Sequence, residues 1–235
     1  MKIEVWSDVV CPFCFIGKRH LEEAIEQSGF DGQIDVVYKA YELDPTAPAT
    51  TDEPYHVSLA RKYQISDEQA EEMVDNILQR ARGAGLYYRT SEWTMANTFN
   101  AHRVTKYAAE EGKENEMVER FFSSYLEEAK KIGTDEVILS IAEEAGLNVE
   151  KVKEVLEGEA YADEVRQDIA EAKQVGVQGV PFFVFNRKYA VPGAMPTESF
   201  VEVIQKVAEE EGLEAKPQVL DIEGSGMCTD GKCEM

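Results

Sequence analysis

Two cysteines separated by two residues, Cys11-Pro12-Phe13-Cys14, lie between a short apolar segment and a helical pattern. Residues 2–6 are predicted to form a strand, and the apolar positions after the motif recur with a helical period until Gly29. The unpaired amides at the start of a helix favour a negative charge, so they stabilise a cysteine thiolate there. The motif therefore requires a strand followed at once by a helix that carries two thiols in its first turn.

The other apolar patterns predict an α/β fold. Residues 34–41 are rich in β-branched and aromatic side chains and predict a second strand, which completes a βαβ unit. The pattern then changes to successive helices, and Ser66 with Gln69 predicts a capping box before one of them. Strands are predicted again at residues 181–185 and 189–191, followed by a helix from Thr197 to about Glu211.

The helical patterns also predict how the chain is divided. One apolar stripe predicts a single packed helix, and its members are Met117, Val118, Phe121, Phe122, Tyr125, Leu126 and Ala129. Thr134 and Asn148 are predicted to cap two more helices, which end near Gly146 and Gly158. We therefore expect a discontinuous α/β domain of residues 1–52 and 175–212, a helical insertion domain of residues 53–174, and a mobile C-terminal tail of residues 213–235.

The charge of the chain argues against two classes of partner. The 46 acidic and 24 basic residues give a formal net charge of -22, which repels phosphate backbones and anionic lipids. We therefore expect neither nucleic acid nor a membrane as a partner. The first residues include Glu4 and Asp8 and contain no apolar run of signal-peptide length, which predicts a cytoplasmic protein.

Four cysteines in a reducing compartment favour redox chemistry or metal binding over a structural disulfide framework. Cys11 is expected to attack a disulfide, and Cys14 to resolve the mixed disulfide that forms. Two alternatives stay open: the pair are ordinary buried cysteines, or they hold zinc together with Cys228 and Cys233. Because Asp230-Gly231 predicts a turn between Cys228 and Cys233, these two form a possible second redox pair.

Two further positions carry polar groups near the motif or in the helical region. Asp8 is a possible proton relay for the buried sulfur, and the alternative is a loop carboxylate that accepts hydrogen bonds from backbone amides. His102 and Arg103 lie within a predicted helix, where we expect a packed histidine or one that bonds between domains. Neither position alone indicates a metal site.

Four stretches in consistent order resemble the DsbA-like thioredoxin superfamily, and within it the cytoplasmic FrnE-type branch. They are SDVVCPFCFIG at 7–17, NTFNAHR at 97–103, GVQGVPFFVF at 176–185 and YAVPGA at 189–194. The resemblance implies a thioredoxin-like fold (βαβ…ββα) with a large inserted all-helical domain. It also implies that Pro181 is cis and lies against Cys11, with Pro12, Phe13 and Val180 beside the substrate. From the residues alone, a trans proline that begins an edge strand stays open as an alternative.

These observations predict a thiol–disulfide oxidoreductase that acts on protein or small disulfides through Cys11 and Cys14. The direction of electron flow and the oligomeric state are open. We expect no bound cofactor or metal, and glutathione is a candidate electron donor. The alternative is a glutathione-dependent isomerase or transferase of the kappa class, such as 2-hydroxychromene-2-carboxylate isomerase, which shares the inserted helical architecture but usually carries serine in this region. A third hypothesis is a non-enzymatic zinc adaptor or chaperone-like binder.

Overall fold

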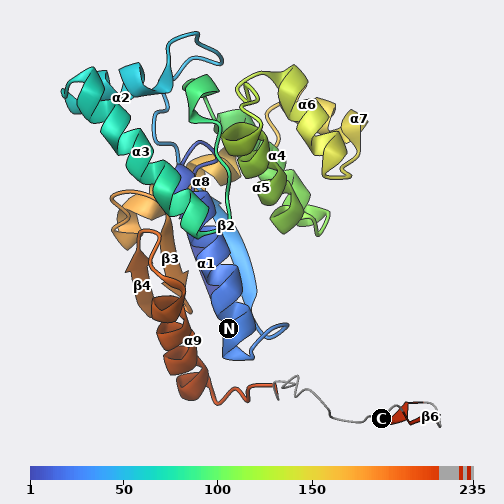
Figure 1. Ribbon diagram of the computed structural model, residues 1–235. Helices are drawn as coiled ribbons and strands as arrows, with labels where there is room; N and C mark the ends of the chain where they lie inside the picture. Colours follow the sequence, from blue (N-terminus) through green and yellow to red (C-terminus); the bar gives the residue numbers. More distant parts are fainter. Residues whose placement is uncertain (217–227, 230–231, 234–235) are drawn as a thin grey trace.

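A computed structural model of the protein describes residues 1–216, together with the backbone of residues 228–229 and 232–233 (Figure 1). The strands are β1 (Lys2–Ser7), β2 (Asp35–Ala40), β3 (Phe182–Phe185), β4 (Tyr189–Pro192), β5 (Cys228–Thr229) and β6 (Lys232–Cys233). The helices are α1 (Pro12–Ser28), α2 (Tyr55–Tyr63), α3 (Asp67–Gly83), α4 (Phe99–Glu110), α5 (Glu114–Phe122), α6 (Asp135–Glu144), α7 (Val149–Glu157), α8 (Ala162–Val175) and α9 (Thr197–Glu211). A 3-10 turn, η1 (Thr90–Glu92), and a π-helical segment, η2 (Ser123–Glu127), interrupt the helical region.

A mixed four-stranded sheet with the order β2-β1-β3-β4 forms the base of the molecule. β1 runs parallel to β2 and antiparallel to β3, and β3 runs antiparallel to β4. Successive side chains of a strand point to opposite faces, so Ile3 and Val5 enter the main core while Trp6 enters a smaller one. α1 and α9 lie side by side along the first face (Figure 1). On the second face, the indole of Trp6 donates to the Asp168 carbonyl of α8 at 3.0 Å.

The helices α2–α7 stand above the C-terminal ends of β1 and β2 (Figure 1). The prediction of one continuous helix over residues 117–129 is wrong, because α5 ends at Phe122 and η2 follows it. In η2 the amide of Glu128 donates to the carbonyl of Ser123 at 3.0 Å, a bond one residue longer than in an α-helix. Ala129 then takes a φ of 56°, which ends the helical path. The apolar stripe predicts burial and cannot distinguish these two helical geometries.

The predicted caps agree with the structure in most cases. The capping box is confirmed, because the Gln69 amide donates to Ser66 Oγ at 3.2 Å and the Ser66 amide to Gln69 Oε1 at 3.0 Å. Asn148 caps α7 by accepting a bond from the Lys151 amide at 3.1 Å. Thr134 occupies the N-cap of α6, but its hydroxyl donates to a preceding carbonyl instead of capping the helix.

Side chains from the helices bind the outer edge of β2. Glu114 Oε2 accepts a hydrogen bond from the Tyr38 amide at 3.2 Å, and Lys106 Nζ donates to the Tyr38 carbonyl at 3.0 Å. Asp168 Oδ2 accepts from the Ala40 amide at 3.0 Å. Because α8 contacts both β2 and α4, it connects the sheet to the helical region, and the predicted boundary at residue 175 stays a proposal.

The last described residue of the continuous chain, Lys216, donates its amide to the Gly29 carbonyl at 2.8 Å. Gly29 is the C-cap of α1, with a φ of 74°. Farther along, β5 and β6 pair antiparallel with Cys228 opposite Cys233. The side chains of this predicted second redox pair lie outside the described residues, as do residues 217–227, 230–231 and 234–235 of the predicted mobile tail. Within the described ranges, no helix is long and apolar enough to cross a membrane.

Candidate functional site

Cys11 and Cys14 lie at the N-terminal end of α1, directly above the end of β1. Cys11 is the N-cap residue and has an extended conformation. Pro12 is the first helical residue, a position where an N–H would have no partner within the helix, so proline loses no hydrogen bond there. The Cys11 amide donates to the Asp8 carbonyl at 2.9 Å, which closes the turn between strand and helix. Both cysteines are free thiols that are almost fully buried, with 4% and 3% of their surfaces exposed.

The environment of Cys14 disfavours its thiolate. Burial raises the pKa of the Cys14 thiol well above its usual value, and the Cys11 side chain raises it further through a hydrogen bond and its charge. The backbone amide of Asp8 and the hydroxyl of Ser7 act in the opposite direction, because each can donate a hydrogen bond to a Cys14 thiolate. The Cys14 thiol therefore holds its proton more tightly than an exposed cysteine does.

The loop that precedes β3 closes over the pair. The Val180–Pro181 peptide bond is cis, and the Cys11 thiol donates to the Val180 carbonyl at 3.6 Å. Gly17 on α1 lets this loop come close, since a Cβ there would stand 3.2 Å from Pro181 Cγ and 3.0 Å from the Phe183 ring. The structure thus places the predicted residues Pro181 and Val180 next to Cys11.

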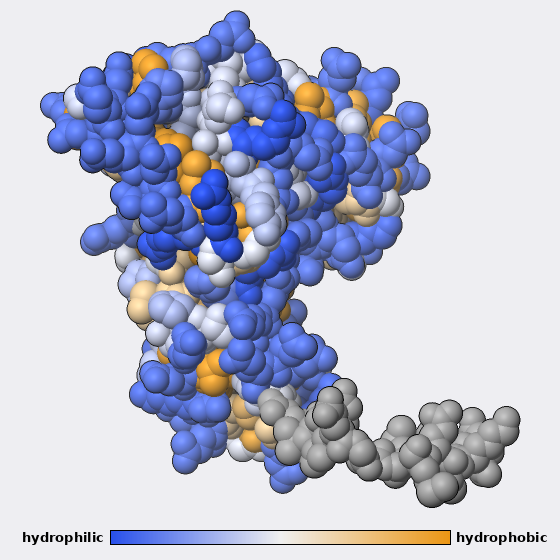
Figure 2. Space-filling model, viewed as in Figure 1, coloured by the Kyte–Doolittle hydropathy of each residue, from blue (hydrophilic) through white to orange (hydrophobic). Residues whose placement is uncertain are grey.

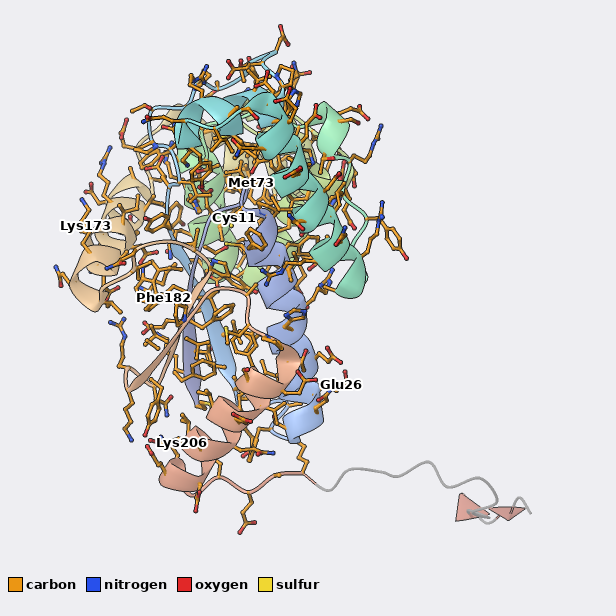
Figure 3. All side chains as sticks on the ribbon, turned by 60° about the vertical axis from the view of Figure 1, so that its left-hand side comes forward. Cys11, Glu26, Met73, Lys173, Phe182 and Lys206 are labelled. Carbon is orange, nitrogen blue, oxygen red and sulfur yellow. The ribbon has the colours of Figure 1, made fainter. Side chains whose placement is uncertain are left out.

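A cavity of about 520 Å³ opens beside Cys11. It lies between the start of α1 and the helices α2 and α3, and Figure 3 shows Met73 of α3 above Cys11. Most of its wall is apolar, and its lining includes Cys11, Phe13, Tyr63, Met73, Met95 and Val180. A second cavity of about 420 Å³ lies on the other side of Val180, against Pro181 and Gly193. Val180 therefore lines two cavities, of which the larger also contacts Cys11.

Two tyrosines of the helical region face the cysteines. The hydroxyl of Tyr88 donates to the Pro12 carbonyl at 2.8 Å. Burial raises the pKa of Tyr88 and of Tyr55, and the charge of a Cys11 thiolate raises both further. The sequence analysis missed both tyrosines, as it missed Met73, because each is more than 40 residues from the motif and belongs to no recognisable pattern. Their proximity arises only when α2 and α3 pack over α1.

The carboxylate of Asp8 contacts the segment after β2 and a histidine of α4. Its Oδ2 accepts a hydrogen bond from the Leu43 amide at 2.7 Å, while Oδ1 lies 3.4 Å from Nε2 of His102. His102 is buried, and its Nε2 bonds the Tyr41 carbonyl at 3.0 Å, so α4 is tied to the chain after β2 as expected of a packed histidine. The bond from the Leu43 amide agrees with the interpretation of Asp8 as a loop carboxylate that accepts a hydrogen bond from a backbone amide. The other oxygen, Oδ1, is buried and has no hydrogen-bond partner among the described residues.

Other predicted polar residues have structural roles. Arg103 donates to the carbonyls of Val155, Gly158 and Ala160, which lie at and beyond the end of α7. Within residues 1–216, no cluster of three or more His, Cys, Asp or Glu side chains could hold a metal ion. The zinc alternative depends on Cys228 and Cys233, whose side chains are not among the described ones. Figure 2 shows a mostly hydrophilic surface with scattered hydrophobic residues.

Comparison with known proteins places this architecture in a family. Residues 2–215 match the model of the DSBA-like thioredoxin domain. The chain belongs to this family. The predicted thioredoxin-like α/β fold with a helical insertion is therefore confirmed. A DSBA-like relative, the uncharacterized protein YwbO of Bacillus subtilis, is 30% identical over 203 residues, which cover 86% of this chain and 94% of YwbO.

Solved structures extend the DSBA-like likeness to the whole chain. A "probable DsbA oxidoreductase" from Streptomyces coelicolor is 35% identical with a TM-score of 0.82, covering 100% of this chain and 99% of that one. A 2-hydroxychromene-2-carboxylate isomerase has a TM-score of 0.70 at 14% identity, covering 90% and 98% of the two chains. The cytosolic disulfide reductase DsbM of Pseudomonas aeruginosa, solved with GSH, has a TM-score of 0.58 at 14% identity, covering 89% and 100%. The last two share the fold, and one fold hosts different chemistries.

Proposed function

We propose that this DSBA-like protein is a thiol–disulfide oxidoreductase in which Cys11 is the nucleophile and Cys14 the resolving cysteine. The observation that carries the proposal is the pair of free thiols at the start of α1, with the Cys11 thiol bonded to the Val180 carbonyl. Cys11 lines the large cavity, whereas Cys14 does not. A substrate sulfur therefore reaches Cys11 first, and the helix N-terminus stabilises the thiolate that attacks it.

The chemistry follows from this arrangement. The Cys11 thiolate attacks one sulfur of a substrate disulfide, the substrate S–S bond breaks, and a thiolate leaves as a mixed disulfide forms on Cys11. Cys14 then loses its proton and attacks Cys11, which forms the Cys11–Cys14 disulfide and releases the substrate as a dithiol. Two electrons pass from the protein to the substrate. In the reverse direction the Cys11–Cys14 disulfide oxidises a substrate dithiol through the same mixed disulfide.

The remaining proposals concern the cellular compartment, the family branch and the partners of the protein. We assign the protein to the cytoplasm and to the FrnE-type branch, on the sequence stretches described above. A reducing cytoplasm favours reduction or isomerisation of disulfides over net oxidation, with glutathione as a candidate electron donor. Disulfide-containing or dithiol-containing proteins are the proposed partners, because the cavity beside Cys11 is larger than a single small disulfide needs and is lined by apolar side chains.

Cys228 and Cys233 are proposed as a second redox pair that exchanges electrons with Cys11 and Cys14. Their opposed positions in the β5–β6 register support the proposal. The experiment replaces both by serine in the full chain and compares steady-state turnover with a single turnover. Slower steady-state turnover with an unchanged single turnover supports the relay. Unchanged values for both rates make the pair dispensable.

The glutathione-dependent isomerase is the second candidate, and the fold shared with 2-hydroxychromene-2-carboxylate isomerase favours it. That likeness extends to the fold alone. The paired thiols argue for disulfide exchange, because an enzyme that only binds glutathione has no use for a resolving cysteine at position 14. Turnover of a chromene substrate by a variant with serine at both positions 11 and 14 would favour the isomerase.

A trapping experiment tests the leading proposal. In a Cys14→Ser variant, the mixed disulfide on Cys11 cannot be resolved, so substrate proteins accumulate on Cys11 as adducts that dithiothreitol releases. The matched control is the Cys11→Ser variant, in which the remaining thiol is farther from the cavity. Absence of adducts from the Cys14→Ser variant, together with a wild type that shows no redox-dependent change in mobility, contradicts the proposal.

A further inference from the structure

In the resolving step the buried Cys14 must give up its proton, and the cysteine pair alone provides no group that accepts it. A thiolate is the attacking species, so Cys14 must lose a proton before it attacks the mixed disulfide. Only 3% of Cys14 is exposed, and its surroundings favour the protonated thiol. The Asp8 carboxylate, the nearest acid in sequence, accepts a bond from the Leu43 amide through Oδ2 and lies beside His102 through Oδ1. Another path for the proton is needed.

A small cavity of about 20 Å³ lies between β1, β2, α4 and α5. Most of its lining is apolar, and the polar side chains along it include those of Ser7, His102, Thr105 and Lys106. This volume suits one water molecule, which needs polar partners such as these. The Ser7 hydroxyl is also a hydrogen-bond partner of the Cys14 thiolate. Ser7 therefore connects the sulfur of Cys14 to the cavity that His102 lines from the opposite element.

The contacts of His102 prepare it to accept a proton. Its Nε2 lies 3.0 Å from the Tyr41 carbonyl, and a carbonyl can only accept, so Nε2 carries the hydrogen. In the neutral ring the other nitrogen, Nδ1, is then the basic one. Asp8 Oδ1 stands 3.4 Å from Nε2 and has no hydrogen-bond partner among the described residues. This orphaned carboxylate oxygen stabilises the imidazolium that forms when His102 gains a proton.

The other charged groups around His102 and the cavity come from the strand and the helix packed against them. Glu42 follows β2, and its charge interacts with that of His102. Lys106 of α4 already bonds the Tyr38 carbonyl and Asp168, and Lys39 of β2 bonds Asp168 and Glu171. These two ammonium groups are committed to Asp168. The charged groups around His102 are therefore the carboxylates of Asp8 and Glu42 and two lysines that are already paired with Asp168.

We propose that His102 accepts the proton of Cys14 through the Ser7 hydroxyl and one water in the small cavity, with Asp8 stabilising the charged ring. The proposal rests on the thiol–disulfide function proposed above. In the resolving step the Cys14 proton passes to Ser7, the hydroxyl proton of Ser7 to the water, and a water proton to His102 Nδ1. The Cys14 thiolate then bonds Cys11, the Cys11–substrate bond breaks, and the substrate sulfur leaves as a thiolate that takes a proton from solvent. His102 is a positioning residue for protons and touches neither sulfur.

The test separates the two chemical steps in the full-length protein. A peptide disulfide carrying a fluorophore and its quencher is mixed with excess enzyme, and both the formation and the resolution of the mixed disulfide are followed between pH 5.5 and 9. The variants are His102→Gln and Ser7→Ala, with His56→Gln as the matched control on α2. Urea denaturation establishes that each variant is folded before its rates are compared.

The expected result is specific to one step and to one pH range. Resolution should slow by about 10-fold or more near pH 7 in His102→Gln and in Ser7→Ala, because general bases contribute on the order of 10²-fold or more. The difference should close toward pH 9, where hydroxide takes the proton, and formation of the mixed disulfide should be unchanged. A slowing equal at every pH, or equal in both steps, overturns the relay and assigns His102 a purely structural role. A wild type that forms no mixed disulfide instead refutes the proposed function itself.

Discussion

The hydroxyl of Tyr88 donates a hydrogen bond of 2.8 Å to the carbonyl oxygen of Pro12, so a residue between α3 and η1 holds the first turn of the redox helix. A Tyr88→Phe variant loses this buried bond and keeps the ring. We expect the free energy of unfolding to fall by about 1 kcal/mol in urea denaturation. The control is Tyr87→Phe, because Tyr87 is 75% exposed. Equal stabilities for the two variants would show that the bond to Pro12 contributes nothing.

Gly17 determines how closely α1 approaches the Pro181 loop. In Gly17→Ala the new methyl group meets the Phe183 ring at 3.0 Å and Pro181 at 3.2 Å. Overpacking of this kind costs about 1–3 kcal/mol, which exceeds the gain of about 1 kcal/mol from replacing a helical glycine. We expect a lower unfolding free energy and slower attack by Cys11, because the loop moves away from the sulfur. Gly83→Ala is the control on α3, where nothing lies within 4 Å. That variant should be as stable as the wild type or more so.

Glu114 makes stability depend on pH. Burial raises its pKa from 4.5 to about 7, with Asp168 and Asp35 adding to the shift and the Tyr38 amide and Lys106 opposing it. Between these two values the folded protein holds a proton that the unfolded chain has released, so stability falls as pH rises from about 4.5 to 7. A Glu114→Gln variant removes this dependence. We expect it to exceed the wild type by about 1–3 kcal/mol at pH 8 and to match it near pH 4.5.

The measurement for Glu114 is a series of urea denaturations from pH 4.5 to 8. Glu116→Gln is the matched control, because Glu116 lies on the same helix and is exposed. Its stability difference from the wild type should not change with pH. Parallel stability curves for Glu114→Gln and the wild type would mean that the carboxyl group of Glu114 titrates normally.

Met73 forms part of the cavity wall above Cys11 (Figure 3). A flexible methionine adapts to varied apolar side chains, so we expect this wall to favour peptides with a bulky apolar residue next to their cysteine. In Met73→Gln, kcat/KM for a peptide disulfide with a neighbouring phenylalanine should fall by about 10-fold, because part of roughly 1.5–3 kcal/mol of burial is lost. The same peptide with serine in that place should react at the wild-type rate.

The control for the cavity wall is Met195→Gln. Met195 is 40% exposed, similar to the 37% of Met73, and does not line the cavity. Both peptides should react with this variant as they do with the wild type. If Met73→Gln slows both peptides equally, the wall does not select side chains.

Features with local signals could be predicted from the sequence. The thiol pair at the start of α1, the capping box of Ser66 and the bounds of α9 each depend on residues within a turn or two of one another. The change from α5 to η2 could not be predicted, because an apolar stripe repeats almost equally well in either helical geometry. Such stripes predict which side chains are buried, but they do not distinguish an α-helical from a π-helical backbone.

The parts of the site that come from distant segments could not be predicted. The cavity wall at Met73 and the bond from Tyr88 to Pro12 depend on how α2 and α3 lie over α1. Asp8 illustrates the same limit, since both interpretations were open until the positions of Leu43 and His102 were known. Sequence motifs indicate the reacting atoms, and tertiary packing decides which groups surround them.

The charged side chains on the outer edge of β2 also affect how this protein meets its own copies. A bare edge strand offers free amides and carbonyls to any other strand and is a common starting point for aggregation. Over Tyr38 and Ala40 those groups are already taken by Glu114, Lys106 and Asp168. A protein with polypeptide substrates, as proposed above, is exposed to extended strands. Blocking this edge with its own helices prevents such strands from joining the sheet at Tyr38 and Ala40.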